Sequence, residues 1–181
     1  MSQYTARQIH LKSRPAGMPT QEHFELVTAE LRPPAQGEAL VRNLYMSVDP
    51  YMRGRMREEA VYATAYAVGE VMYGGALGEV VESNDPSLRP GDIVLNQAAW
   101  QDRFVAKADT LSKLEPFDPA QLSLYLGTLG MPGLTAYVGL FKFGEPKPGE
   151  TVFVSAASGA VGANVCQIAK LMGCRVLGRV G

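Results

Sequence analysis

The stretch Thr151-Val-Phe-Val-Ser-Ala-Ala-Ser-Gly-Ala-Val-Gly162 decides the fold of this chain. Residues 151–155 are mostly β-branched or aromatic, which is typical of a buried parallel strand. A glycine-containing turn follows them, and then an apolar stretch with helical spacing. A strand that turns through glycines into a helix presents backbone N–H groups to a pyrophosphate. The order of these elements therefore predicts a dinucleotide-binding turn.

The residues of this turn are the candidate cofactor ligands. Gly159 and Gly162 allow a ligand to approach the backbone and the helix to pack closely on the strand. Position 157 holds Ala where the commonest fingerprint has Gly, which fits an Ala-x-x-Gly-x-x-Gly variant that begins at Ala156. The alternative is a tight strand-to-helix turn that binds nothing. The predicted cofactor-binding residues are Ala157, Ser158, Gly159, Ala160, Val161 and Gly162.

The residues after the turn complete one β-α-β unit. Apolar residues recur at helical spacing after Gly162, which predicts that one helix face packs on a sheet while Asn164 faces elsewhere. Gly173 is positioned to end this helix, and residues 175–178 indicate a second parallel strand. A doubly wound sheet needs two longer halves. We therefore predict the start of a Rossmann domain that is incomplete in this chain.

The residues before this unit show a different sequence pattern. Residues 7–126 consist of short extended runs broken by Gly, Pro, Asn and Asp, which is typical of an antiparallel β domain. Helical periodicity then appears around a break at Pro132-Gly133, which predicts two linking helices. The predicted class is α/β overall. The predicted domains are a β domain at 1–125, a helical connection at 126–150 and a nucleotide-binding start at 151–181.

Composition excludes several classes of partner. The 181-residue chain has 17 basic and 18 acidic residues, so it has no charge excess to attract nucleic acid or an anionic membrane. The N-terminal residues lack the apolar core of a signal peptide, and no later stretch is apolar for long enough to span a bilayer, so we expect a cytoplasmic protein. Cys166 and Cys174, with only His10 and His23 available, are interpreted as small buried side chains and not as zinc ligands.

Three motifs together resemble one branch of the medium-chain dehydrogenase/reductase superfamily. The branch is zinc-independent and contains leukotriene B4 12-hydroxydehydrogenase, the prostaglandin reductases and bacterial curcumin reductase. The resemblance covers essentially the whole chain and implies a GroES-like β domain before a Rossmann domain, with the site between them. The motifs are Ser47-Val-Asp-Pro-Tyr-Met-Arg-Gly-Arg-Met56, Met131-Pro-Gly-Leu-Thr-Ala-Tyr137 and Ala156-Ala-Ser-Gly-Ala-Val-Gly162.

The resemblance implies reduction of a carbon–carbon double bond without a metal. Zinc-dependent relatives use a Cys and a Gly-His-Glu, whereas this chain has Met46 near the first position and no His in residues 68–75. Glu70 is interpreted as a solvated or ion-paired carboxylate. In the implied reaction NADPH delivers hydride to the β-carbon of an enone or enal. The rival functions are a quinone reductase of the same superfamily and a non-catalytic module that binds other proteins through an exposed sheet edge.

The same resemblance names candidate residues in the β domain. It places Pro50 and Tyr51 against the nicotinamide and the acceptor, with Tyr51 packed at a loop corner as the alternative. Asp49 and Arg53 are expected to pair with each other across this turn. Trp100 is implied to contact substrate at the cleft wall, and core packing is an equal alternative.

Further candidates follow along the chain. Met131 and Thr135 are implied to lie beside the nicotinamide and its ribose, with helix capping and packing as the alternative. Arg179 stands where a basic side chain favours NADP(H) by binding its 2′-phosphate. The catalytic residue is not assigned, because the family's Tyr that assists the enolate would lie beyond Gly181. We expect the full-length protein to be a homodimeric enzyme acting on a small enone, enal or quinone, and this chain alone to bind NADPH poorly.

Overall fold

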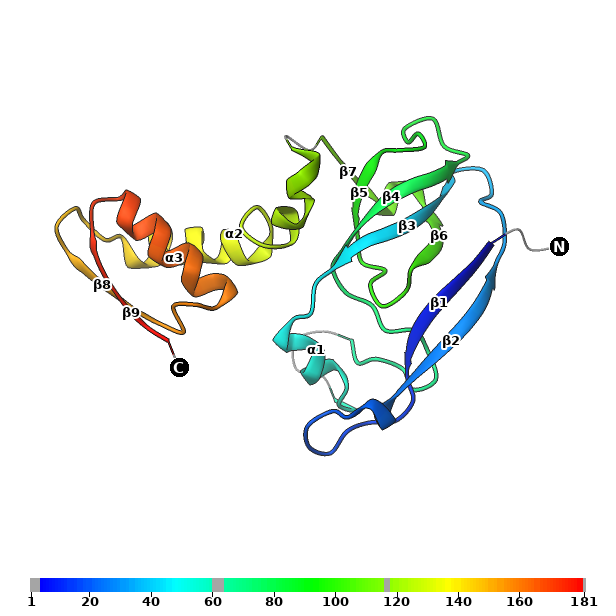
Figure 1. Ribbon diagram of the computed structural model, residues 1–181, viewed down its shortest axis with the longest axis horizontal. Coiled ribbons are helices and arrows are strands. Elements are labelled where there is room, and N and C mark those ends of the chain that lie inside the picture. Colours follow the sequence, from blue (N-terminus) through cyan, green and yellow to red (C-terminus); the bar gives the residue numbers. More distant parts are fainter. Residues whose placement is uncertain (1–3, 60–63, 116–117, 181) are drawn as a thin grey trace. The chain divides into compact units, whose positions relative to one another are not determined.

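The structure is a computed structural model that describes residues 4–59, 64–115 and 118–180. The chain divides into two compact units, Met1–Pro119 and Ala120–Gly181. Strands dominate the first unit, and the second combines helices with a pair of strands (Figure 1). Each unit has buried apolar side chains of its own.

The first residues of the second unit belong to a short helix. Residues 120–125 group with this unit. They lie in a 3₁₀ helix, Pro119–Leu126. The backbone N–H of Leu129 donates to the carbonyl of Leu124 at 2.9 Å, so this helix is tied to the segment that follows it.

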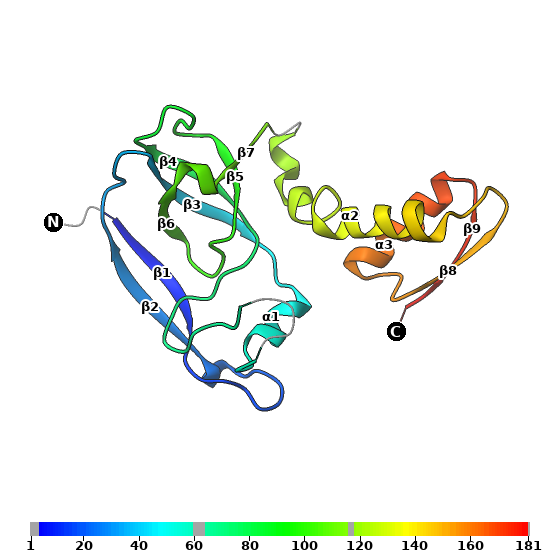
Figure 2. The same ribbon diagram turned by 180° about the vertical axis from the view of Figure 1, so that it is seen from behind.

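Two antiparallel sheets build the described part of the first unit. β1 (Tyr4–Leu11) pairs with β2 (Phe24–Leu31) along the full length of both strands. The second sheet has the strand order β6-β3-β4-β5-β7 (Figure 2). The predicted antiparallel β domain is therefore confirmed. The strands of the second sheet are β3 (Glu38–Met46), β4 (Ala76–Ser83), β5 (Ile93–Asn96), β6 (Arg103–Lys107) and β7 (Ser112–Leu114).

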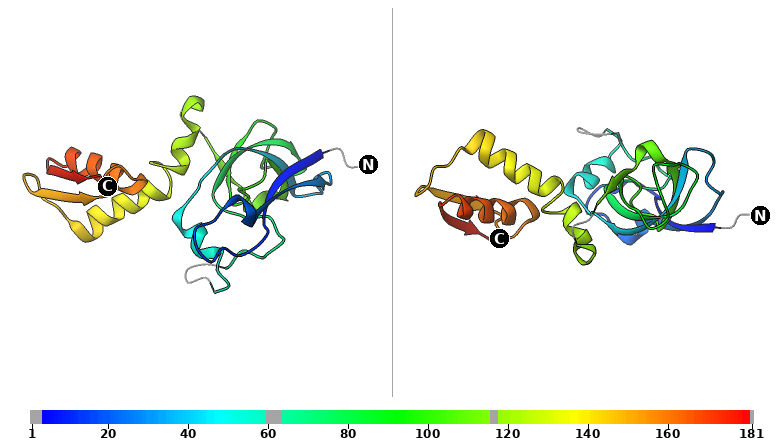
Figure 3. Two further views of the ribbon diagram at one scale, coloured as in Figure 1. Left: turned by 60° about the horizontal axis from the view of Figure 1, so that its bottom comes forward. Right: turned by 90° about the horizontal axis from the view of Figure 1, so that it is seen from above.

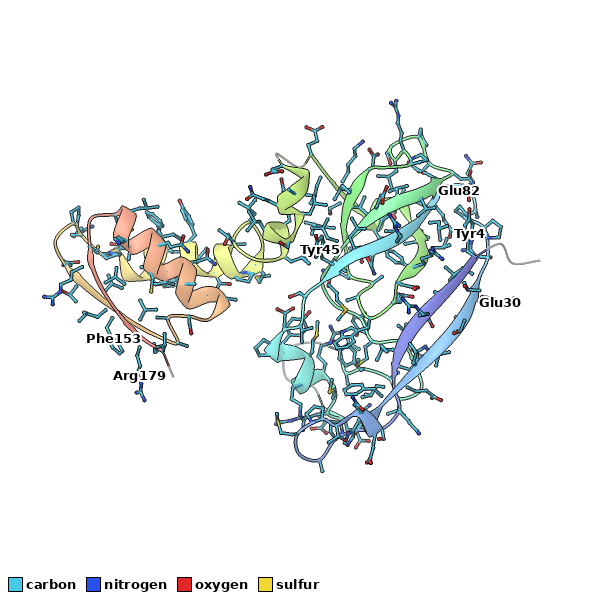
Figure 4. The ribbon with its side chains drawn as sticks, viewed as in Figure 1. Tyr4, Glu30, Tyr45, Glu82, Phe153 and Arg179 are labelled. Carbon is cyan, nitrogen blue, oxygen red and sulfur yellow. The ribbon has the colours of Figure 1, made fainter. Side chains whose placement is uncertain are left out.

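Hydrogen bonds join the two sheets. The Tyr4 hydroxyl donates to Glu82 Oε2 at 3.1 Å, between the start of β1 and the end of β4 (Figure 4). The backbone N–H of Ile9 donates to the carbonyl of Trp100 at 2.8 Å. These bonds connect residues more than seventy positions apart in sequence. The second bond holds the segment around Trp100 against β1.

Two buried clusters stabilise the first unit. One includes alternate residues of the five-stranded sheet, such as Ala39 and Val41 of β3, because side chains of a strand alternate between its two faces. The other surrounds the short helix α1 (Pro50–Arg55) and fixes its position through Met52. Burial of one large apolar side chain contributes about 1.5–3 kcal/mol. The buried members of the second cluster are Leu11, Met52, Met56, Tyr66 and Met72.

The second unit contains the predicted β-α-β unit. β8 (Thr151–Ser155) and β9 (Arg175–Arg179) pair in parallel, and α3 (Ala160–Leu171) connects them. The helix α2 (Met131–Val138) lies alongside α3 (Figure 3). The sequence prediction of this unit is confirmed. Its core consists of Leu140, Ala169 and Cys174, with Val152, Val165, Ile168, Met172 and Val176 packed against them.

The break between the linking helices lies earlier than predicted. Pro132 belongs to the first turn of α2, and the reversal before it falls at residues 127–130. Proline is tolerated there because first-turn N–H groups have no intrahelical acceptor. A Cβ at Gly133 would lie 1.7 Å from the carbonyl oxygen of Thr128, so α2 begins in direct contact with the turn before it.

Asn164 is a buried polar residue of α3. Its Nδ2 donates to the carbonyl of Ala160, one turn earlier in α3, at 2.7 Å. This local bond satisfies the amide, so the polar side chain can lie within the packed unit.

α2 continues directly into a π-helical segment, Gly139–Gly144. Within the described residues, no single helix has both the length and the apolar composition needed to cross a membrane. Only the pair Ala120–Leu126 and Met131–Gly144, bent by 53°, reaches those two criteria jointly.

Candidate active site

The glycine turn begins with a residue in the left-handed region. Ala156 has a φ of +49°, a conformation that glycine adopts readily and alanine adopts rarely. Its carbonyl accepts the N–H of Gly159 at 2.9 Å, which closes the turn. The N–H of Ala157 donates to the carbonyl of Arg179 at 3.0 Å, which ties the turn to the end of β9. Ala156 therefore sets the turn, although the sequence pattern did not place it among the ligands.

Two glycines have no room for a side chain at this turn. A Cβ at Gly162 would lie 2.2 Å from the carbonyl oxygen of Ala156, and a Cβ at Gly178 would lie 2.7 Å from the Cβ of Ala157. Gly159 is the N-cap of α3, and no side chain caps this helix. The first-turn N–H groups of a helix have no intrahelical acceptor. They are therefore available to an anion such as a pyrophosphate.

The other predicted ligands lie at an open edge of the second unit. Ser158 and Ala160 are exposed, and Val161 is 38% exposed. Arg179 lies opposite Ser155 at the carboxyl ends of the two strands. Its side chain projects from the end of β9 on the side away from α3 (Figure 4). The structure brings the backbone of Arg179 to the turn, since its carbonyl accepts the N–H of Ala157.

The two candidates on α2 differ in their surroundings. Met131 is 73% exposed. The hydroxyl of Thr135 donates to the carbonyl of Met131 at 2.7 Å. The proton of this hydroxyl is therefore engaged in a hydrogen bond within α2, which agrees with a structural role for Thr135. Its oxygen still has lone pairs that accept a hydrogen bond.

In the first unit, α1 presents Tyr51 to solvent. Pro50 lies in the first turn of this helix, and Tyr51 remains 42% exposed. A Cβ at Gly74 would lie 3.3 Å from the Tyr51 hydroxyl oxygen and 2.4 Å from the Met52 methyl carbon. The Tyr51 hydroxyl and the Met52 side chain therefore pack close to the backbone at Gly74, where a larger residue would clash.

Charges around Tyr51 act in opposite directions. Burial raises the pKa of Tyr51, and the nearby Asp49 raises it further, while Arg55 and a hydrogen bond from the Gly75 backbone amide lower it. The net direction is upward, so the phenol keeps its proton at neutral pH and can donate it in a hydrogen bond.

The expected Asp49–Arg53 ion pair is absent from the described residues. Instead, Arg53 Nη2 donates to the carbonyls of Pro15 at 3.0 Å and Gly17 at 2.7 Å. These carbonyls belong to the loop between β1 and β2. The Arg53 side chain bonds to them and not to Asp49, the residue that precedes α1. Arg53 therefore fixes this loop to α1.

Trp100 packs against a neighbouring ring and also borders a pocket of the first unit. Its φ is +64°, and its ring stacks on Phe24 with centroids 6.5 Å apart. Its Nε1 is buried and has no hydrogen-bond partner among the residues that the structure describes. It also lines a pocket of about 370 Å³ together with Leu26, Tyr45 and Met46, and Tyr51 is not part of that lining.

The side chains that could serve as metal ligands are not grouped together in the described residues. Across residues 4–59, 64–115 and 118–180, no group of three or more His, Cys, Asp or Glu is arranged to hold a metal ion. Glu70 is exposed. His10 is hydrogen-bonded through Nδ1 to the carbonyl of Gly69 and through Nε2 to Oε1 of Gln8.

Tyr66 gives the first unit an alkaline dependence of stability. Its hydroxyl donates to the carbonyl of Tyr73 at 2.7 Å, and burial raises its pKa from 10.0 to about 12. The folded state holds this proton more tightly than the unfolded chain does. The corresponding stability, about 2–3 kcal/mol, is therefore complete below pH 10 and is lost as the pH rises toward the folded pKa. We expect the urea midpoint to fall across this window.

The control for this prediction is Tyr66→Phe, measured by urea unfolding at several pH values from neutral to strongly alkaline. The variant loses the ionisable group, so its midpoint should decline less over the alkaline window than that of the natural chain. An equally steep decline in both proteins would assign the effect to other groups.

A β domain of this kind, followed by a strand, a glycine turn and a helix, defines a class of nucleotide-dependent oxidoreductases. Residues 7–114 match the family described as the N-terminal domain of oxidoreductase. The chain therefore belongs to this oxidoreductase family.

Similar proteins of known name narrow the class. The chain is 50% identical over 171 residues to the NADPH-dependent curcumin reductase of Escherichia coli, covering 94% of this chain and 49% of that protein. It is 44% identical to the NADP(+)-dependent 2-alkenal reductase of Nicotiana tabacum, covering 97% of this chain and 52% of that protein. The chain thus spans about half the length of the curated relatives it matches.

Solved structures agree with this similarity. The CurA protein of Vibrio vulnificus in complex with NADPH is 46% identical, with a TM-score of 0.88 over 97% of this chain and 52% of that chain. A quinone oxidoreductase of Pseudomonas syringae, at 23% identity and a TM-score of 0.67, shares the fold. The resemblance to the N-terminal portion of medium-chain reductases is confirmed, and with it the GroES-like character of the β domain.

Proposed function

We propose that this chain contributes to an NADPH-dependent reductase of the activated C=C bond of α,β-unsaturated ketones and aldehydes. The observation that carries the proposal is the turn between β8 and α3. There Gly162 and Gly178 allow α3 and β9 to pack closely on Ala156 and Ala157, and no side chain caps α3. The names of the similar curcumin reductase and 2-alkenal reductase support this reaction class. An alkenal carries a double bond conjugated to a carbonyl group.

The residues of the second unit fit the phosphates of NADPH. The uncapped N-terminus of α3 supplies N–H donors and the positive end of the helix dipole, both of which favour a pyrophosphate. The exposed guanidinium of Arg179 supplies a charge for the 2′-phosphate. When it is bound, NADPH supplies the hydride, and the protein contributes binding and orientation.

The proposed role of Tyr51 is to donate a hydrogen bond to the carbonyl oxygen of the acceptor. Negative charge grows on this oxygen as hydride reaches the β-carbon, so a donor aimed at it stabilises the transition state. Tyr51 is exposed, and its hydroxyl lies against Gly74. The proposal includes no zinc, since Met46 and Glu70 occupy the regions where zinc-dependent relatives have ligands.

The test compares this chain with the protein expressed from its complete gene. NADPH and NADH are titrated by fluorescence, and the loss of cofactor absorbance is followed with 2-nonenal and with a simple quinone. We expect the complete protein to bind NADPH more tightly than NADH and to reduce the enal faster than the quinone. We expect this chain alone to bind weakly. If neither protein binds NADPH or turns over substrate, and both associate as their concentration rises, the result would support the non-catalytic interaction module.

Arg179→Glu tests the choice of cofactor. The change replaces a positive charge with a negative one near the proposed 2′-phosphate, so the preference for NADPH over NADH should fall by about ten- to a hundredfold. Arg175→Glu is the matched control, because Arg175 is exposed on the same face of β9 at its other end. Equal loss of preference in both variants would indicate a general charge effect and not a specific contact.

A further inference from the structure

Arg55 is a buried cation on the helix that carries Tyr51. Its side chain belongs to a residue only 8% exposed, and the spacing of four residues puts it on the same face of α1 as Tyr51. Its Nε donates to the carbonyl of Thr64 at 2.9 Å, and its own carbonyl accepts the N–H of Tyr66 at 2.7 Å. Arg55 is therefore held from both its backbone and its side chain.

Three tyrosine rings surround this guanidinium. The Arg55 Cζ lies 3.9 Å from the ring centroid of Tyr73, 4.7 Å from that of Tyr66 and 6.0 Å from that of Tyr51. The negative faces of aromatic rings attract a cation at these distances. We call these three residues and Arg55 the tyrosine cage.

No carboxylate forms an ion pair with Arg55 within the part of the chain that the structure describes, although Asp49 acts on Tyr51 and Tyr66 of the cage. The ion pairs there involve Arg7, Arg32, Arg42 and Lys113. A buried charge without a counterion is costly, and a neutral side chain of similar length would fill the same space more cheaply. The positive charge itself therefore calls for an explanation beyond packing.

Tyr51 differs from the other two tyrosines of the cage. The hydroxyl of Tyr66 donates to the carbonyl of Tyr73 at 2.7 Å, and that of Tyr73 donates to the carbonyl of Thr64 at 3.4 Å. The rings of Tyr66 and Tyr73 also meet edge to face, with centroids 5.1 Å apart. By contrast, the Tyr51 hydroxyl donates to no carbonyl among the described residues, and the Gly75 amide faces its oxygen, so its proton remains available for an acceptor.

The charge of Arg55 acts on Tyr51 in the direction that strengthens donation. Burial and Asp49 raise the pKa of Tyr51, whereas Arg55 and the Gly75 amide lower it. A cation near a phenol stabilises negative charge on its oxygen and makes its proton a better hydrogen-bond donor. Tyr66 and Tyr73, which also face the cation, keep their protons on backbone carbonyls.

We infer that Arg55 is a positioning residue for Tyr51, whose ring it orients in the tyrosine cage and whose hydroxyl it makes a stronger donor toward the acceptor's oxygen. The inference rests on the proposed function for the identity of that acceptor. The coupling between Arg55 and Tyr51 belongs to the first unit and is measurable without any turnover.

The experiment replaces Arg55 with methionine, which keeps an unbranched chain of similar length and removes the charge. Arg57→Met is the matched control, because it removes an exposed positive charge just beyond the same helix. In this chain, labelled at tyrosine Cζ, the NMR titration of Tyr51 is identified as the resonance lost in Tyr51→Phe. In the complete protein, kcat and KM are measured with an enal.

We expect Arg55→Met to shift the Tyr51 titration to higher pH and to lower kcat about tenfold, with KM for NADPH within about twofold of the natural value. Arg55→Lys, which restores the cation, should recover most of both changes, and Arg57→Met should alter neither. If Arg55→Met does not fold, the comparison of Arg55→Lys with Arg55→Gln replaces it. Circular dichroism verifies the fold of every variant.

Two results would separate the possible failures. A folded Arg55→Met variant with an unchanged Tyr51 titration would overturn the inference. Arg55 would then have only the structural role of holding residues 64–73 in place. Absence of enal reduction in the natural protein would overturn the proposed function, while the titration would still judge the coupling between Arg55 and Tyr51.

Discussion

Gly162→Ala is expected to weaken NADPH binding by about a hundredfold or more, equivalent to roughly 3 kcal/mol. The added Cβ would lie 2.2 Å from the carbonyl oxygen and 2.9 Å from the carbonyl carbon of Ala156. Both are backbone atoms of the turn, so no side-chain rotation relieves the clash. The start of α3 must move away from β8, and the N–H groups proposed to bind the pyrophosphate move with it.

The measurement is calorimetric titration of NADPH into the complete protein, with the melting temperature of each variant recorded alongside. Gly139→Ala is the control, because a Cβ at this helical position meets nothing within 4 Å. That variant should bind NADPH normally, and its stability should change by no more than about 1 kcal/mol. Natural NADPH affinity in a folded Gly162→Ala protein would remove the turn from the proposed cofactor site.

Tyr51→Phe is expected to lower kcat for enal reduction by about a hundredfold, within the range observed when one oxyanion donor is removed. The change deletes only the hydroxyl, whose oxygen would lie 3.3 Å from a Cβ at Gly74, and leaves the ring beside Arg55. Because the hydrogen bond is proposed to strengthen as charge develops, kcat should fall far more than KM rises.

Steady-state kinetics with saturating NADPH measure this effect. Tyr4→Phe is the matched control, since it also deletes one phenolic hydroxyl, here one that donates to Glu82 at 3.1 Å between β1 and β4. It should lower stability slightly and leave kcat unchanged. A Tyr51→Phe enzyme with a natural kcat would show that another group stabilises the acceptor's oxygen.

The predictable part of this fold is carried by local pattern. The β8–α3–β9 unit follows from a β-branched run, two glycines and a period of apolar residues, all within 151–179. The antiparallel β domain follows from extended runs between turn residues. In both cases neighbours in sequence determine the outcome, because strand and helix periodicity are properties of short segments.

The structure differs from the sequence-based predictions at positions whose conformation depends on contacts with distant residues or with the backbone. The break between the linking helices falls at residues 127–130, because the start of α2 packs on the backbone of Thr128 at Gly133. Arg53 binds the carbonyls of Pro15 and Gly17, which lie thirty-six or more positions earlier, and not the neighbouring Asp49. Periodicity carries no information about such partners.

The amino-acid sequence by itself determined the class of the fold, the glycine turn with its candidate ligands and the motif that carries Tyr51. Each is encoded by residue types at short spacing, so no knowledge of the folded chain is needed. Only the tertiary structure decided that Ala156 takes the left-handed conformation and that Arg55 lies among Tyr51, Tyr66 and Tyr73. The physical reason is that a side chain's charge environment is set by residues that folding brings together, here from α1 and from the segment before β4.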